Sequence, residues 1–338
     1  MKASTAPPAG PGLRAALRRR AVGRTLLTFA EFMEVALYDP ESGYYRRRRP
    51  RVGYGPGTDF LTATASAPLF GRLVVAACAR LLAPADPGGF EFVEIGAEPG
   101  AGLLRGLAHP FRSARQVGIG EGLRIQGPSV VFSNELFDAQ PFRRFRFRGG
   151  QWRERGVALE GEMLAEEEIP EPAPPPFALP AFAAEGYQID APFAATRLAR
   201  AIADQPWSGL FLALDYGKSW EEIAYSTPEG TARAYRNHAQ ERDLLAHPGE
   251  QDLTCHVCWD WLRQSLEAGG FPCPCLESQE AFFTLRAGDF IAALAAAEAG
   301  RMSRDKLSLL QLLHPANMGQ QFQALWALRP SRSPSQTG

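Results

Sequence analysis

The residues best suited to chemistry directly follow a short apolar run in the middle of the chain. Val130–Ser133 is β-branched and aromatic, as is typical of a buried strand, and Asn134, Glu135 and Asp138 come next. In an open α/β sheet, ligands bind just beyond the carboxyl ends of such strands. An amide and two carboxylates at that place indicate a catalytic cluster, in which Glu135 and Asp138 share one face as the chain turns toward a helix. The structural alternative is that Asp138 caps this helix, Glu135 pairs with an arginine and Asn134 satisfies the strand end.

A glycine-rich segment earlier in the chain is a second candidate site. Phe92–Ile95 is typical of a short strand, the loop that follows contains Gly96 and Gly100, and Leu103–Leu107 predicts a helix. Glycines let the backbone approach a ligand, and the amino end of a helix offers free N–H groups. This pattern predicts a loop for a nucleotide-like cofactor, although a purely structural turn has the same composition.

Acidic residues around this loop favour one kind of cofactor. Glu121 lies about 20 residues further on, at the distance from which a carboxylate binds ribose hydroxyls. Glu94 comes two residues before Gly96, where its carboxylate suits the ammonium of S-adenosyl-L-methionine. A dinucleotide pyrophosphate would be repelled by Glu94 and Glu98 so close to its position. The sequence therefore favours S-adenosyl-L-methionine.

Alternating strands and helices must position these residues. We predict helices over 28–37, 68–82, 193–202 and 279–297, strands over 115–119, 129–133, 209–214 and 322–328, and a hairpin over 142–159 turning at Gly149 and Gly150. Thr28 followed by Glu31 is a capping box that begins the first helix. A proline-rich stretch over 169–180 is a surface excursion or linker. This order predicts a doubly wound α/β sheet with an inserted hairpin.

Composition limits the class of protein. With 338 residues, 45% of them hydrophobic, the chain fits one enlarged α/β domain or two lobes. A net charge of −1 argues against a general binder of nucleic acid or of membrane surfaces. No run approaches the roughly 18 apolar residues of a membrane span. The oligomeric state is left open.

The amino terminus and the cysteines concern the cellular compartment. No acidic residue occurs before Glu31, and residues 1–27 are expected to be a flexible arginine-rich segment. A mitochondrial transit peptide shares this composition, but an arginine-rich leader of a bacterial, cytoplasmic protein is favoured over the mitochondrial matrix. Five cysteines, an odd number, suit a reducing compartment. The spacing in Cys255-His256-Val257-Cys258 and Cys273-Pro274-Cys275 is poor for zinc, so no metal is predicted.

Several motifs together carry a resemblance that runs in one order from about residue 28 to the carboxyl end. The chain resembles the MidA-like family of class I S-adenosyl-L-methionine-dependent methyltransferases, which includes a mitochondrial protein-arginine methyltransferase acting in respiratory complex I assembly. The matching pieces are Phe32-Met33-x-x-Ala36-Leu37-Tyr38-x-Pro40-x-x-Gly43-Tyr44-Tyr45, Asp59-Phe60-x-Thr62, Phe70-Gly71, Glu94-Ile95-Gly96, Asn134-Glu135-x-Phe137-Asp138-Ala139, Asp215-Tyr216-Gly217, Gly230-Thr231-x-x-Ala234-Tyr235 with His238, Asp252-Leu253-Thr254-x-His256-Val257, and Met318-Gly319 with Phe322.

The resemblance implies a Rossmann-like methyltransferase domain over residues 28–330, with amino-terminal helices, an insertion around 142–190 and a disordered tail over 331–338. It implies that Glu94, Gly96, Gly100 and Glu121 surround the cofactor, with Asp59 and Thr62 in a loop near the same pocket. Asn134, Glu135 and Asp138 would then face the substrate, for which a protein side chain such as arginine is expected. His238 and His256 are weaker candidates for a base.

The chain departs from the family pattern at two places. Glu98 stands where the family usually has a glycine, and Pro99 follows it. Only about a dozen residues separate the second predicted strand from Val130, where the family normally has a helix, a strand and an adenine-contacting loop. A catalytically degenerate protein that keeps the fold as an assembly or binding module is therefore the alternative function.

Overall fold

A computed structural model describes residues 9–47, 68–97, 100, 102–301 and 303–331, and the chain divides into two units. Unit 1 comprises Met1–Leu61, Phe137–Thr196 and Gly217–Asp260, and unit 2 comprises Thr62–Leu136, Arg197–Tyr216 and Trp261–Gly338. The chain therefore passes between the units five times. A methyltransferase domain over residues 28–330 with an insertion around 142–190 stays a prediction.

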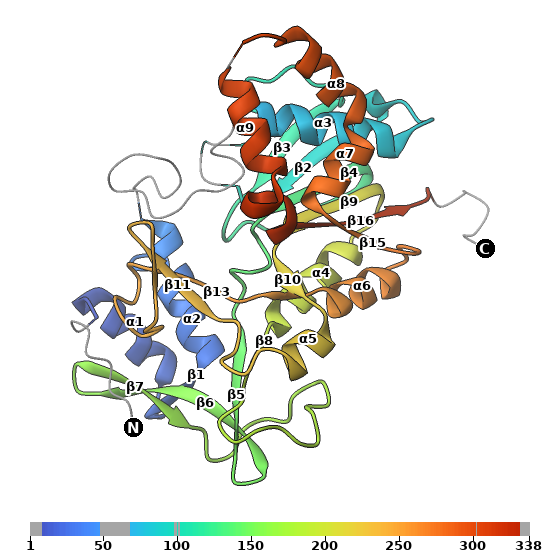
Figure 1. The fold of residues 1–338 in the computed structure, drawn as a ribbon. Helices are drawn as coiled ribbons and strands as arrows, with labels where there is room; N and C mark the ends of the chain where they lie inside the picture. Colours follow the sequence, from blue (N-terminus) through green and yellow to red (C-terminus); the bar gives the residue numbers. More distant parts are fainter. Residues whose placement is uncertain (1–8, 48–67, 98–99, 101, 302, 332–338) are drawn as a thin grey trace. The chain divides into compact units, whose positions relative to one another are not determined.

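Unit 2 is built on a six-stranded sheet in the order β15-β16-β9-β4-β2-β3. Its strands are β2 (Glu91–Ile95), β3 (Ser113–Val117), β4 (Gly127–Asn134), β9 (Trp207–Asp215), β15 (Cys275–Ser278) and β16 (Gln323–Arg329). Strands β3, β2, β4 and β9 are parallel, whereas β16 and β15 each run antiparallel to their neighbours. This sheet confirms the predicted doubly wound α/β class (Figure 1).

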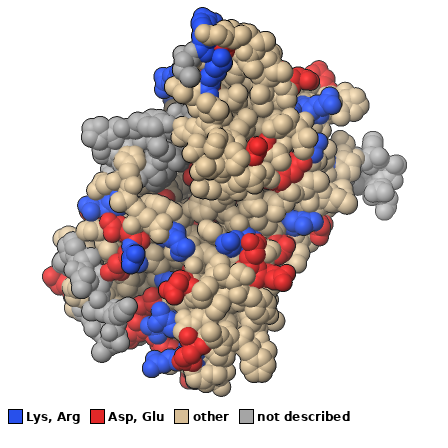
Figure 2. Space-filling view, in the orientation of Figure 1, with Lys and Arg blue, Asp and Glu red and all other residues tan. Residues whose placement is uncertain are grey.

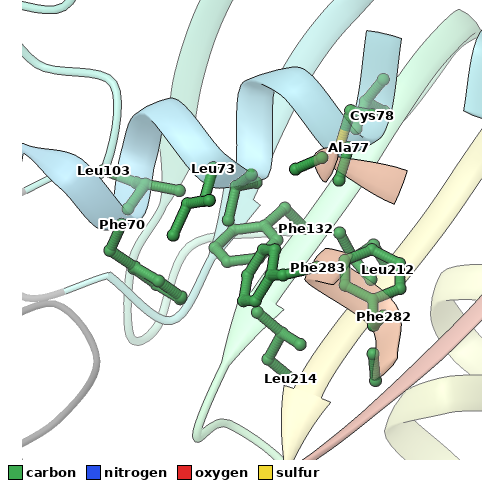
Figure 3. Close-up of a cluster of buried hydrophobic side chains, with 14 of the residues drawn as sticks. Phe70, Leu73, Ala77, Cys78, Leu103, Phe132, Leu212, Leu214, Phe282 and Phe283 are labelled. Atoms are coloured by element: carbon green, nitrogen blue, oxygen red, sulfur yellow. The ribbon is translucent and has the colours of Figure 1, made fainter. Parts of the chain in front are cut away.

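Apolar helices cover this sheet because each buries one face against it. They are α3 (Leu69–Leu82), α7 (Gln279–Arg286), α8 (Gly288–Ala297) and α9 (Arg304–Leu313). Figure 3 shows the core between them and the sheet, in which Phe70 and Leu73 of α3 approach Phe132 of β4 and Phe283 of α7. The ring centroids of Phe70 and Phe283 are 6.1 Å apart in an edge-to-face arrangement. On the other side, Trp207 packs against Phe271, which follows α6 (Trp259–Ala268), with ring centroids 5.0 Å apart.

Two connections in unit 2 contain less regular structure than the pattern predicts. The predicted helix over Leu103–Leu107 is wrong, because these residues form turns. Residues 118–126 lead directly from β3 to β4 without a helix or a strand. In the part of the chain that the structure describes, β3 is therefore the last strand of the sheet, as the short spacing in the sequence indicates.

Unit 1 combines helices with small sheets. Its helices are α1 (Pro11–Ala21), α2 (Phe29–Tyr38), α4 (Phe193–Ala203, which continues into unit 2) and α5 (Trp220–Tyr225). One sheet has the order β1-β6-β5-β8 with β7 also paired to β6, from β1 (Leu26–Thr28), β5 (Arg143–Arg148), β6 (Gln151–Glu160), β7 (Met163–Glu168) and β8 (Gln188–Ala191). The others are β12-β11-β13 and β10-β14, from β10 (Gly217–Lys218), β11 (Arg233–Arg236), β12 (Ala239–Glu241), β13 (Asp252–Thr254) and β14 (Val257–Cys258).

Helix α2 begins as predicted, whereas α1 corrects the expectation for residues 1–27. Thr28 Oγ1 accepts a hydrogen bond from the N–H of Glu31, and the Glu31 carboxylate accepts one from the N–H of Thr28. Helix α1 buries Leu13 and Leu17 in the same core as α2, so the described residues of this segment are folded. Arg24 pairs with Glu31 at 2.8 Å.

The predicted hairpin is confirmed as β5 and β6, with Gly149 (φ 58°) and Gly150 (φ 77°) at its turn. Two positive φ angles in succession are typical of a type I′ hairpin, which favours glycine. Arg143 of β5 forms an ion pair with the buried carboxylate of Glu154. Figure 2 shows that positive and negative side chains are interspersed over the hairpin side of unit 1. No helix among the described residues is both long enough and apolar enough to span a membrane.

Candidate functional site

The parallel strands of unit 2 end at one edge of the sheet. Ile95 of β2 lies opposite Val117 of β3 and Ser133 of β4, and Asn134 of β4 lies opposite Leu214 of β9. The residues that follow these strands therefore meet at the carboxyl edge, which is where open α/β sheets bind ligands.

Gly96 forms the first turn at this edge. Its N–H donates to the carbonyl oxygen of Val117 at 3.0 Å, and its φ of +83° lies in the left-handed region. A Cβ atom at Gly96 would lie 2.7 Å from Cδ1 of Leu136, so a side chain would strain the backbone and also meet its neighbour. Gly100, also left-handed at +78°, belongs to the same connection. The turn at the end of β2 therefore needs glycine, as predicted for a loop that a ligand approaches.

Glu94 lies inside β2 and is 6% exposed. Its Oε2 accepts a hydrogen bond of 2.8 Å from the N–H of Leu103, across the turn that replaces the predicted helix. Burial raises the pKa of Glu94 to about 7, although the Leu103 N–H favours the ionised form. A carboxylate in such a position is stabilised by a nearby cation.

Glu121 lies in the connection after β3 and is exposed. Its carboxylate accepts a hydrogen bond of 3.0 Å from the N–H of Gly118, and its own N–H donates to the Gly118 carbonyl oxygen at 3.1 Å. The side chain is thereby held over the end of β3, where the sequence predicts contact with a ribose.

Asn134 and Glu135 form the turn at the end of β4. Glu135 has a φ of +49°, and its N–H donates to the carbonyl oxygen of Leu214 at 2.9 Å. Residues other than glycine rarely adopt this conformation, which is concentrated at functional sites. Asn134 Nδ2 donates to Glu135 Oε1 at 3.0 Å, and Asn134 Oδ1 is a buried acceptor with no hydrogen-bond partner among the described residues.

Asp138 belongs to unit 1, and the residues around it form a turn rather than the expected helix. It is 3% exposed, and its carbonyl oxygen accepts a hydrogen bond from the N–H of Cys255. Within unit 1, burial raises the pKa of Tyr38 and of Tyr45, and the charges of Asp252 and Asp138 raise both further. Tyr45 Oη donates to Asp252 Oδ1 at 2.8 Å.

Sequence patterns predicted Asp138 but not its grouping with Tyr38, Tyr45 and Asp252. Its only signal in the sequence is that Tyr38, Tyr45 and Asp252 occur within motifs of the family resemblance. The motifs lie too far apart in the chain for any local pattern to connect them.

The positions of the two candidate histidines are explained by the fold. His238 (φ 62°) and Asn237 (φ 50°) form the two-residue turn between β11 and β12, a position that requires positive φ angles. Burial, together with the charges of Lys218 and Arg233, lowers the pKa of His256 to about 4. His256 is therefore neutral at physiological pH.

Asp215 and Tyr216 end β9. Asp215 Oδ1 accepts a hydrogen bond of 2.9 Å from the N–H of Tyr216, whose ring packs edge-to-face on Phe322. These contacts fix the chain at the strand end. The predicted cofactor residues Asp59 and Thr62 lie outside the described residues, as does Glu98.

Comparisons with known proteins agree with the class of enzyme that the sequence motifs indicated. The model of a family described as "Putative S-adenosyl-L-methionine-dependent methyltransferase" matches residues 120–273. The chain is 24% identical over 316 residues to the "Protein arginine methyltransferase NDUFAF7 homolog, mitochondrial" of Drosophila melanogaster, covering 75% of this chain and 70% of that protein.

Two crystal structures from Burkholderia thailandensis are similar over nearly the whole chain. One, bound to S-adenosyl-homocysteine, has a TM-score of 0.78 and 25% identity and covers 96% of this chain and 95% of that one. A native structure of a protein from the same superfamily has a TM-score of 0.76 and 23% identity, with the same coverage.

The residues at the carboxyl edge fit a cofactor with an amino-acid moiety. Gly96 provides a turn at the strand end whose space a Cβ atom would fill. The buried carboxylate of Glu94 favours a positively charged ligand. Together with these similarities, the geometry of the edge identifies an S-adenosyl-L-methionine-dependent methyltransferase that is similar to the MidA-like family.

Proposed function

We propose that this methyltransferase modifies a protein side chain, specifically the guanidinium group of an arginine. The Drosophila relative is named a protein arginine methyltransferase, which supports this acceptor. The observation that carries the proposal is the strained turn at Asn134 and Glu135, where a carboxylate and a buried amide oxygen occur together at the carboxyl end of β4.

Glu135 suits a guanidinium acceptor chemically. A guanidinium is protonated in water and has donors in a fork that matches a carboxylate. Glu135 would hold two of these N–H groups and draw the positive charge away from the attacking nitrogen. The bound cofactor supplies an electrophilic methyl group on a sulfonium. The nitrogen–carbon bond would form as the methyl–sulfur bond breaks, with S-adenosyl-homocysteine as the leaving product. The proton that the methylated nitrogen loses would pass to the Glu135 carboxylate, which we assign as its acceptor.

Asn134 would position the acceptor beside Glu135. Its Nδ2 is engaged by Glu135 Oε1, which fixes the amide and leaves Oδ1 as the atom able to accept an N–H. A buried acceptor without a partner costs about 1–3 kcal/mol, which a bound donor would recover. Asp138 remains a predicted catalytic residue, to be tested by its own variant.

The cofactor residues are part of the same proposal. We assign Glu94 to the positively charged methionine end, Gly96 and Gly100 to the backbone turn beside it, and Glu121 to the ribose. Asp59 and Thr62 keep their predicted place near the cofactor on the basis of the sequence alone.

Methyl transfer from radiolabelled cofactor to lysate proteins tests the acceptor and Glu135 together. Wild type should label protein, and acid hydrolysis should recover the label as methylarginine. Glu135→Gln should reduce labelling at least 100-fold, because loss of a positioned acid–base group typically costs that much, while binding of S-adenosyl-homocysteine stays within about threefold. Glu91→Gln, at the opposite end of β2, is the control and should label normally.

The outcomes separate the candidates. Label recovered as another methylated amino acid would reject arginine but keep the enzyme. Undiminished labelling by Glu135→Gln would reject the catalytic assignment. A wild-type protein that labels nothing, yet forms a stable partner complex that survives Glu135→Ala, would favour the binding-module alternative.

A further inference from the structure

Strand β3 and the connection after it form an open end of the unit 2 sheet. In the part of the chain that the structure describes, β3 pairs with β2 alone. Ser113, Ala114 and Gln116 of β3 are exposed. As far as the structure describes the chain, a ligand at the carboxyl end of β3 therefore has a neighbouring strand on one side only.

The connection over residues 118–126 is held by hydrogen bonds within itself and to β3. Glu121 is bonded in both directions to Gly118, and Arg115 of β3 donates through its Nη2 to the carbonyl oxygen of Arg124. Ile125 is fully buried and anchors the far end of the connection. These contacts hold the connection in a compact conformation against β3.

This compact connection lies at the surface of the protein. Gly120, Glu121, Gly122 and Arg124 are exposed, and Ile119 and Leu123 are half-buried. The two half-buried apolar side chains offer contact to one face of a flat ring. The neighbouring exposed residues indicate that solvent reaches this segment.

We propose that this enzyme leaves the nucleobase of its cofactor largely in solvent and therefore discriminates weakly between bases. The inference rests on the proposed contact between Glu121 and the ribose. Because the base is attached directly to the ribose, it must lie within a few ångströms of Glu121, at the exposed connection after β3. Affinity then depends on the methionine and ribose ends, through Glu94, Gly96 and Glu121, and little on the groups at the rim of the base.

The chemistry of recognition makes this distinction measurable. A site that buries a hydrogen bond to the 6-amino group of adenine loses about 5- to 150-fold in affinity when that group is replaced. A bulky substituent on the same nitrogen is excluded from an enclosed pocket altogether. Contact with one face of the ring is indifferent to both changes.

Isothermal titration of the full chain tests the proposal with three ligands. They are S-adenosyl-homocysteine, S-inosyl-homocysteine, in which an oxygen replaces the 6-amino group, and an N6-benzyl derivative of S-adenosyl-homocysteine. All three should bind with dissociation constants within about threefold, below the loss expected for a buried hydrogen bond. Both analogues should displace S-adenosyl-homocysteine competitively.

Variants connect the result to Glu121. Glu121→Gln should weaken all three ligands by the same factor, about tenfold, because the ribose is common to them. Glu267→Gln, which changes an exposed side chain on α6, should change none of them. An unchanged affinity in Glu121→Gln would overturn the inferred place of the base.

The remaining outcomes are equally decisive. If S-adenosyl-homocysteine binds but the benzyl derivative binds more than tenfold more weakly, the base is enclosed, and this inference fails while the proposed function stands. If S-adenosyl-homocysteine itself does not bind, both the assigned cofactor residues and this inference are wrong.

Discussion

Replacing Glu94 by glutamine should make the ligand-free protein more stable above neutral pH. Burial raises the pKa of this carboxyl from 4.5 to about 7. Because the folded protein holds the proton more tightly than the unfolded chain, the stabilisation is complete below pH 4.5. It is lost progressively as the pH rises through 7. At pH 8 the ionised side chain therefore costs about 3 kcal/mol, from about 1.4 kcal/mol for each pKa unit.

Glutamine removes this charge and keeps the hydrogen bond. Its side-chain oxygen can accept the N–H of Leu103, as Glu94 Oε2 does at 2.8 Å. The stability difference between Glu94→Gln and wild type should therefore be about 2–3 kcal/mol larger at pH 8 than at pH 5. Urea denaturation followed by circular dichroism at both pH values measures this difference.

Glu91→Gln is the matched control on the same strand. Its carboxylate is 22% exposed and forms an ion pair with Arg115 at 3.2 Å. A pair of this kind contributes up to about 1 kcal/mol, with little change between the two pH values. Parallel pH profiles of wild type and Glu94→Gln would refute the reasoning, since they would mean that Glu94 titrates alike in the folded and unfolded chain.

The same variant should lose cofactor affinity while gaining stability. A cation beside Glu94 lowers its pKa, so binding in the wild type should release a proton below pH 7 and tighten as the pH rises. Titration of S-adenosyl-L-methionine between pH 6 and 8 should show this dependence in wild type and not in Glu94→Gln. Equal pH dependence in the two proteins would remove Glu94 from the cofactor site.

Three further substitutions test separate parts of the structure. Gly96→Ala should lower the free energy of unfolding by more than about 2 kcal/mol and weaken the binding of S-adenosyl-homocysteine at least tenfold. Gly106 is also left-handed, at +75°, but has open space around it, so Gly106→Ala should cost only about 1 kcal/mol of backbone strain. Equal effects of the two substitutions would show that the contact with Leu136 does not matter. Leu17→Ala in α1 should lower the free energy of unfolding by about 2–5 kcal/mol, because Leu17 is fully buried, and Arg18→Ala by less than about 0.5 kcal/mol, because Arg18 is exposed. Thermal or urea denaturation measures both. If neither variant changes stability, residues 1–27 are the flexible segment that the composition predicts. His238→Gly should keep full methyl transfer and equal or slightly raised thermal stability, since glycine suits its turn, and a large loss of activity would make His238 a candidate base again.

Local patterns were sufficient to predict the parallel strands of the unit 2 sheet, the hairpin and several of the helices. The capping box at Thr28 begins α2, and the two-glycine turn joins β5 to β6, because each depends on residues that are neighbours in the chain. The spacing between β3 and β4 also showed that the sheet lacks an additional strand there. Such features follow from backbone preferences and from the length of chain available.

The wrong predictions concern segments whose structure depends on distant partners. Leu103–Leu107 has the composition of a helix, but five residues are too few to offset the cost of helix nucleation. In the structure the side chains of Leu103 and Leu104 are buried in the unit 2 core, and the Leu103 N–H is satisfied by Glu94. The amino-terminal arginines suggested a flexible leader, yet the apolar face between them packs α1 into the core of unit 1.

The sequence by itself determined which residues lie at the ends of the parallel strands. A β-branched run ending in Asn134 and Glu135, and a strand ending in Gly96, fix polar and glycine residues at the carboxyl edge of a parallel sheet. Only the tertiary structure decided the burial and raised pKa of Glu94, the left-handed backbone of Glu135, and the separation of Asp138 into the other unit. These depend on segments brought together by folding, because the dielectric surroundings of a charge and the strain on a turn are set by whatever packs around them.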